Sequence, residues 1–189
     1  MSRFKITELS MTGLKLVERQ RLSDMRGFFT RLFCAEDLAE AGWETQIAQI
    51  NHSYSHGRGT VRGMHFQYPP YAERKLVNCV RGKVWDVAVD LRVDSVTFLR
   101  WHAEELSAEN GKALLIPEGF AHGFQALTDD VELLYCTSEA YHPEAEAGLD
   151  PRDPELAISW PLEITVLSTK DANHPQIDEN FEGVRINVS

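Results

Sequence analysis

The chain has 189 residues, of which 43% are hydrophobic and 25% charged, and its formal net charge is −10. This length and composition predict one globular domain over residues 1–189 with a sizeable core. The negative charge argues against nucleic acid as a partner, because nucleic-acid-binding domains carry basic surfaces. An anionic small ligand would need a local cluster of arginine and lysine acting against the overall charge.

The sequence also indicates the cellular compartment in which the protein is expected. No stretch approaches the roughly 18 uninterrupted apolar residues of a membrane span, and the first residues lack the apolar run of a signal peptide. Cys34, Cys79 and Cys136 are odd in number, widely spaced and set among apolar neighbours. Such cysteines are typical of buried thiols rather than of a disulfide framework. We therefore expect a cytoplasmic protein without a membrane partner.

Short segments of strand-like pattern, separated by turn residues, follow one another along the chain. They are 14–19, 28–34, 46–53, 61–67, 75–80, 83–92, 101–106, 113–117, 118–127 and 131–138. Arg81-Gly82 predicts a hairpin turn within 75–92, and the clearest helix is 35–41, stopped by Gly42. From Pro143 onward the chain is a polar arm. This spacing predicts an all-β sandwich or barrel, which often holds a ligand in its mouth.

Polar side chains that could carry chemistry interrupt several of these strands. In an extended strand, His65 shares one face with Val61 and Gly63 while Arg62 points to the other face, and Gly63 leaves open space beside His65. His122 in Gly119-Phe-Ala-His-Gly-Phe and Tyr135 in Leu133-Leu-Tyr-Cys would face the same interior. Taken alone, His65 or Tyr135 is better explained as a core residue with a satisfied hydrogen bond.

If these polar residues have a function, their types favour general acid–base chemistry. A histidine held by an aspartate such as Asp171 makes a general base, and a tyrosine can donate a proton as general acid. Lys75 could stabilise a developing oxyanion. The alternative for Asp171 is a solvated turn residue.

Metal chemistry is the main rival, because metal sites in small barrels commonly use two histidines and a carboxylate. The positions two residues from His65 are Gly63 and Gln67, so no second histidine accompanies it on its strand. We therefore expect no metal. The remaining histidines are interpreted as surface or structural residues: His52, His56, His102, His142 and His174.

In their order and spacing, the motifs resemble those of the dTDP-4-dehydrorhamnose 3,5-epimerase family over nearly the whole chain. The motifs are Asp24-Met-Arg-Gly-Phe-Phe, Gln49-Ile-Asn, Val61-Arg-Gly-Met-His-Phe-Gln, Lys75-Leu-Val, Val80-Arg-Gly-Lys-Val-Trp-Asp-Val-Ala-Val-Asp-Leu-Arg, Glu105-Leu-Ser-Ala-Glu-Asn, Ile116-Pro-Glu-Gly-Phe-Ala-His-Gly-Phe, Trp160-Pro-Leu and Leu167-Ser-Thr-Lys-Asp. The resemblance implies a cupin-type double-stranded β-helix (jelly-roll) barrel with a few short helices. It also implies a homodimer that shares an N-terminal strand, with the arms packing on the barrel or on the partner, and no metal or organic cofactor.

The resemblance also implies a role for each matching residue. His65 matches the general base, Asp171 its carboxylate partner, Tyr135 the acid on the opposite face of the sugar, Lys75 the lysine at the C4 oxygen, and His122 a second active-site histidine. The implied substrate-binding residues are Arg26 from a neighbouring subunit, Phe29, Arg31, Gln49, Asn51, Arg62, Tyr141 and Lys170. Many relatives carry a glutamate where this chain has Arg31, so the nucleotide base stays open.

The implied activity is inversion of C5, and of C3 as well, in a nucleotide-diphosphate-linked 4-keto-6-deoxyhexose, as in dTDP-L-rhamnose and polysaccharide biosynthesis. Protons beside a ketone are acidic because the carbanion delocalises onto oxygen, so a base, a cation and an acid on the other face suffice for inversion. A 4-keto sugar isomerase on the same barrel is one alternative, and it should lack an acid at Tyr135. A non-catalytic sugar-binding cupin is another, and it leaves the His–Asp–Tyr set unexplained.

Overall fold

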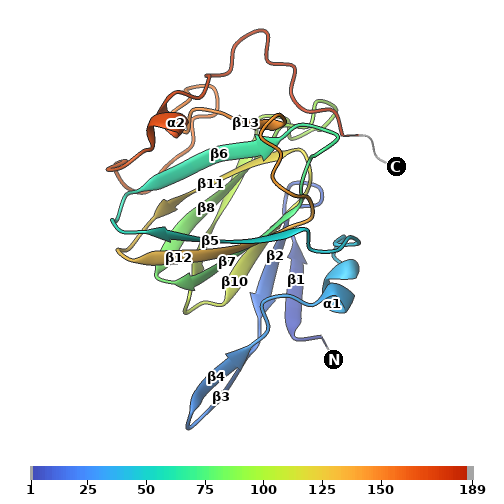
Figure 1. Ribbon diagram of the computed structural model, residues 1–189, viewed down its shortest axis with the longest axis vertical. Helices are drawn as coiled ribbons and strands as arrows, with labels where there is room; N and C mark the ends of the chain where they lie inside the picture. Colours follow the sequence, from blue (N-terminus) through green and yellow to red (C-terminus); the bar gives the residue numbers. More distant parts are fainter. Residues whose placement is uncertain (1, 187–189) are drawn as a thin grey trace.

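The computed structural model describes residues 2–186, in which nearly all regular structure is β-strand (Figure 1). One antiparallel sheet has the order β1 (Phe4–Glu8), β2 (Lys15–Arg19), β10 (Lys112–Ile116), β7 (Lys75–Arg81), β12 (Val131–Thr137) and β5 (Gln49–Ser55). The other has the order β13 (Glu146–Gly148), β6 (Val61–Gln67), β11 (Phe120–Ala126), β8 (Lys83–Asp90) and β9 (Trp101–Ser107). A projecting hairpin of β3 (Arg21–Asp24) and β4 (Gly27–Thr30) and the short helices α1 (Ala35–Ala39) and α2 (Thr169–Ala172) complete the regular elements. The predicted all-β fold with a few short helices is confirmed.

The segment 75–92, predicted as a hairpin, instead connects the two sheets. β7 pairs with β10 and β12, whereas β8 pairs with β9 and β11. The hairpin prediction is wrong because Gly82, at φ +71°, turns the chain from one sheet into the other. A Cβ added to Gly82 would lie 2.7 Å from Thr128 Oγ1 and 3.0 Å from Val131 Cγ2, so this crossing is packed too closely for a side chain.

Apolar residues pack on both faces of each sheet. Side chains from the two sheets meet between them and form the interior core, which includes Val77, Val84, Phe124 and Leu133. Leu38 of α1 and Trp43 cover the outer face of the six-stranded sheet. The arm after β13 covers the outer face of the five-stranded sheet, with Leu149, Leu156 and Val184 against Met64 and Val87. Polar residues that alternate into the interior are therefore exceptions in an apolar layer.

The region around α1 follows the prediction only in part. α1 lies within the predicted helix, and Gly42 follows it at φ +93°, a conformation that suits glycine after a helix. The strand predicted for 28–34 is shorter than expected, because β4 pairs only with β3 and ends at Thr30. Phe33 packs edge-on against Trp43 instead, with 5.4 Å between ring centroids.

The cysteine prediction is confirmed for two of the thiols. Cys79 and Cys136 are buried and Cys34 is half-buried, and all three are free. Burial raises the pKa of the Cys79 thiol to about 11, so this group stays protonated near neutral pH. No helix within residues 2–186 is long and apolar enough to cross a membrane.

β6 departs from regular alternation at Gly63. His65 pairs with His122 but Arg62 pairs with Phe124, so the register shifts between them. Arg62 and His65 consequently line the same cavity, and the prediction that they face opposite ways is wrong. The predicted open space beside Gly63 is also wrong, because an added Cβ would lie 2.8 Å from the His122 carbonyl oxygen.

Replacing Gly63 with alanine is expected to lower the free energy of unfolding by about 2–5 kcal/mol. The φ of +122° is rarely adopted by L-residues, and the added methyl group would meet backbone atoms that cannot move aside. Urea unfolding measures the loss. Gly57→Ala is the matched control, because its nearest neighbour would be Thr60 Oγ1 at 3.8 Å. Equal stability of the two variants would contradict this account.

Candidate active site

A cavity of about 550 Å³ opens between the sheets. Residues of β5, β7 and β12 line one side, residues of β6 and β11 line the other, and the segment around α2 closes part of the rim. The cavity brings together the following residues predicted from the sequence: His65, Lys75, His122, Tyr135, Asp171, Gln49, Asn51, Arg62, Tyr141 and Lys170. It does not include Arg26, Phe29 or Arg31.

His65 and Asp171 form a hydrogen-bonded pair at the cavity wall. The His65 Nε2 atom lies 2.8 Å from Asp171 Oδ1, and Asp171 is only 4% exposed. The Gly63 N–H donates to the other carboxylate oxygen at 3.2 Å, and the Asp171 N–H donates to Ser168 Oγ at the start of α2. Burial raises the pKa of Asp171. These hydrogen bonds and the His65 imidazole together lower the pKa by a larger amount, so the net shift is downward. An ionised Asp171 therefore holds the Nε2 proton of His65 and leaves Nδ1 as the basic nitrogen.

Tyr135 reaches the same cavity from the opposite sheet. It lies on β12, and its hydroxyl is 2.9 Å from Ser53 Oγ on the neighbouring strand β5. Burial raises the pKa of Tyr135 above its ordinary value, so its hydroxyl stays protonated at neutral pH. The His65 pair and Tyr135 thus offer a base and an acid on facing walls.

His122 is the cross-strand neighbour of His65 and pairs with a carboxylate that the sequence analysis did not select. Its Nε2 atom lies 2.9 Å from Asp86 Oδ1, and both side chains are buried. Burial raises the pKa of Asp86, although the His122 imidazole acts in the opposite direction. Asp86 follows the alternation of Val84 and Ala88 into the interior core, and that pattern was available in the sequence.

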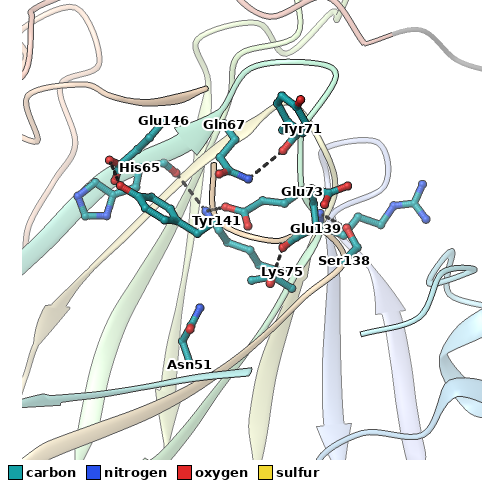
Figure 2. A network of polar contacts seen from close by, with 12 residues as sticks. Asn51, His65, Gln67, Tyr71, Glu73, Lys75, Ser138, Glu139, Tyr141 and Glu146 are labelled. Atoms are coloured by element: carbon teal, nitrogen blue, oxygen red, sulfur yellow. Dashed lines mark hydrogen bonds and ion pairs between the residues drawn. The ribbon is translucent and has the colours of Figure 1, made fainter. Parts of the chain in front are cut away.

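Lys75 is buried with a second acidic residue that the sequence analysis missed. Its Nζ atom lies 3.0 Å from Glu73 Oε1 and donates to the His65 carbonyl oxygen at 3.3 Å (Figure 2). An ammonium group has three N–H donors, so one donor of Lys75 remains for a ligand in the cavity.

The cavity rim carries the predicted substrate-binding groups. Gln49 Nε2 donates to Asn51 Oδ1 at 2.8 Å, and Gln49 Oε1 accepts from the backbone N–H of Tyr141. The Tyr141 hydroxyl donates to Glu146, which also binds Lys170 (Figure 2 shows Tyr141 beside Glu146). These contacts hold a polar edge in place around the opening.

Arg62 supplies a positive charge at this opening. Its Nε and Nη2 atoms donate to Ser55 Oγ and to the Tyr54 carbonyl oxygen at 3.0 and 2.8 Å. These two bonds orient the guanidinium group and leave its other N–H donors available to an anion.

Three predicted site residues lie outside the cavity on the N-terminal side. Arg26 and Phe29 belong to the projecting β3–β4 hairpin, where Arg26 pairs with Asp24. Arg31 follows β4 and pairs with Asp37 of α1 at 3.2 Å. Within one copy of the chain these residues do not reach the site.

Comparison with known proteins identifies the family of the chain. Residues 8–179 match the family model of dTDP-4-dehydrorhamnose 3,5-epimerase. The chain belongs to this family. It is 41% identical over 182 residues to the dTDP-4-dehydrorhamnose 3,5-epimerase of Sinorhizobium fredii, which covers 94% of this chain and 93% of the relative.

Two solved structures of the epimerase family have the same fold as this chain. The dTDP-6-deoxy-D-glucose-3,5-epimerase of Legionella pneumophila, in complex with dTDP-4-keto-L-rhamnose, gives a TM-score of 0.90 at 38% identity over 97% of this chain and 99% of that one. ChmJ, a 3′-monoepimerase from Streptomyces bikiniensis in complex with dTDP-quinovose, gives 0.83 at 37% identity over 89% and 85%. The cupin-type jelly-roll barrel expected from the resemblance is confirmed.

His174 is the third residue beside this epimerase-family site that the sequence analysis did not select. It lies three residues after Asp171, with its Nε2 atom 3.7 Å from Asp171 Oδ1 and its ring 5.7 Å from that of His65. Burial lowers the pKa of His174, and the nearby His65 imidazole lowers it further. His174 therefore packs beside the His65–Asp171 pair, although it is not part of the cavity lining. Its distance from His65 along the chain concealed the contact.

Proposed function

We propose that this chain inverts C5 and C3 of a dTDP-linked 4-keto-6-deoxyhexose by proton transfer, as the names of its relatives indicate. One observation carries the proposal beyond family membership: a histidine–aspartate pair and a protonated tyrosine approach one cavity from opposite sheets. Inversion needs proton removal on one face of the sugar and proton delivery on the other.

The first step is removal of a proton next to the ketone. His65 Nδ1 accepts the proton while Asp171 stabilises the imidazolium that forms. The electron pair of the broken C–H bond moves onto the C4 oxygen and forms an enolate. The free N–H donor of Lys75 stabilises this oxygen, because a buried cation interacts strongly with developing negative charge.

The second step returns a proton from the other side. Tyr135 delivers its hydroxyl proton to the planar carbon, and the configuration inverts because donor and base face each other across the ring. Ser53 Oγ, in hydrogen-bonding distance, can donate to the phenolate that remains. Arg62 and Lys170 at the rim supply positive charge for the diphosphate.

Proton NMR in deuterium oxide with dTDP-4-keto-6-deoxyglucose tests this function. Loss of the C3 and C5 proton signals with appearance of the inverted sugar is the expected result, and loss of one signal alone would define a single-centre epimerase. CDP- and GDP-linked sugars should exchange more slowly than the dTDP-linked sugar. Absence of exchange with all three substrates would contradict the proposal and favour a sugar-binding protein.

The proposal includes a homodimer in which the β3–β4 hairpin reaches the partner's cavity. The hairpin exposes apolar residues that a stable monomer seldom leaves in water: Leu22, Met25, Phe28 and Phe29. A two-stranded hairpin is marginally stable alone, so contact with a second copy would stabilise it. This arrangement would bring Arg26 and Phe29 to the site that they do not reach within their own chain.

Mixing two inactive variants tests the shared site. Arg26→Glu and His65→Asn chains should each be defective alone, whereas random reassortment should restore native sites to about a quarter of the total. The restored site combines the barrel of the Arg26→Glu chain with the hairpin of the His65→Asn chain. Activity after denaturation, mixing and refolding measures this recovery. If activity only equals the average of the two variants, Arg26 does not act across the interface.

A further inference from the structure

Three side chains with metal-binding donor atoms meet beside the cavity. The donor atoms of His65, Asp171 and His174 all lie within 4.8 Å of one another. His174 Nε2 is buried and has no hydrogen-bond partner among the described residues. A buried imidazole nitrogen without a partner is costly, so it is a strong candidate for an additional ligand.

The fold holds the third donor in place. Gly148 of β13 pairs with His65 of β6, and a Cβ added to Gly148 would collide with the His174 ring. The ring therefore occupies the space that the glycine leaves free. Asp171 is fixed from the other side by the N–H of Gly63. Two of the donors thus come from the segment around α2 and the third from β6, and Asp171 and His174 are each restrained by a contact with a strand of the barrel.

We propose that His65, Asp171 and His174 form an inhibitory binding site for a divalent transition-metal ion such as Zn²⁺. Two imidazoles and one carboxylate are a ligand set that such ions prefer. In a tetrahedral site with bonds of about 2.1 Å, neighbouring ligand atoms are about 3.4 Å apart. The gap between His174 and Asp171 is close to this value, whereas the 2.8 Å gap between His65 and Asp171 must widen.

The bound ion and the His65–Asp171 hydrogen bond therefore exclude each other. An ion at this site would occupy a lone pair of His65 and remove Asp171 as its hydrogen-bond partner. The effect on turnover rests on the proposed function, but metal binding does not, so the two are measured separately.

Calorimetric titration of the metal-free, full-length protein with ZnCl₂ tests binding. The native protein should bind one ion, and His174→Ala should weaken binding by about 100-fold or more, because even an outer-shell partner contributes about 10–100-fold. His102→Ala is the matched control. His102 Nε2 lies 3.3 Å from Glu104 Oε1, but within residues 2–186 His102 does not belong to a group of three metal-binding donors. Absence of binding, or equal affinity of native and His174→Ala proteins, would overturn the proposal.

Two further measurements distinguish a failure of the metal-site proposal from a failure of the proposed function. Gly148→Ala keeps all three donors but displaces the His174 ring, so it should also weaken Zn²⁺ binding in a protein with a native circular dichroism spectrum. Zn²⁺ should slow solvent deuterium exchange, and EDTA should restore it. An inactive protein that still needs His174 for binding would contradict only the proposed function. Unchanged turnover with Zn²⁺ bound would overturn the inhibitory role.

Discussion

Replacing His65 with asparagine is expected to lower the rate of deuterium exchange at C3 and C5 by about 10²–10⁴-fold, the usual contribution of a general base. Asparagine keeps a hydrogen-bonding amide near Asp171 but has no basic nitrogen at neutral pH. Proton NMR in deuterium oxide, at saturating sugar concentration, measures the exchange directly. Exchange and formation of the inverted product should fall together, because both begin with the same proton removal.

The control for this substitution is His142→Asn. His142 Nδ1 lies 3.1 Å from Glu144 Oε1, so it is also a histidine–carboxylate pair, but it does not line the cavity. Its replacement should leave exchange close to the native rate. A His65→Asn protein that exchanges at the native rate would exclude His65 as the base.

Replacing Tyr135 with phenylalanine is expected to separate exchange from inversion. The variant keeps His65 and Asp171, so deuterium should still enter the sugar from the base's own face. Formation of the inverted sugar should fall by about 10²–10⁴-fold, because no acid remains on the opposite wall. The ratio of deuterium uptake to product formation, followed by NMR in one sample, measures the separation.

Tyr54→Phe is the control for this variant. Tyr54 is the residue after Ser53, but its hydroxyl donates to Asp130 and does not line the cavity. Its replacement should leave both quantities unchanged. If Tyr135→Phe loses exchange and inversion to the same extent, the division of roles between the two residues is wrong.

Alternation along single strands indicates which side chains of β11 and β12 face the interior, whereas most of the site residues were predicted from the family resemblance. His122 and Tyr135 each follow apolar residues of the same face, and the structure places them in the interior as expected. Asp86 obeys the same rule between Val84 and Ala88, so the sequence contained the signal that would have selected it. The roles of these residues came from the family resemblance, since alternation identifies the face but not the chemistry.

Features that depend on packing between distant segments were not predictable in this way. The sequence at Arg81-Gly82 predicts a hairpin turn. Only the strand partners of β7 and β8 reveal that the chain passes from one sheet to the other at Gly82. The register shift at Gly63 reverses the side on which Arg62 lies, and no local pattern marks it. His174 approaches His65 only because the arm folds back over β6.

The proposed base and acid approach the cavity from opposite sheets, so the core between the sheets sets the distance between them. Two packed sheets are typically about 10 Å apart, and side chains such as Val84 and Leu133 fill that layer here. Thinning the layer would change the span between His65 and Tyr135 without altering either residue. Since a displacement of about 1 Å can cost about 100-fold in rate, substitutions remote from the sugar can change the proportion of molecules that invert. Under the proposed mechanism, product configuration therefore depends on the hydrophobic layer as well as on the residues that touch the sugar.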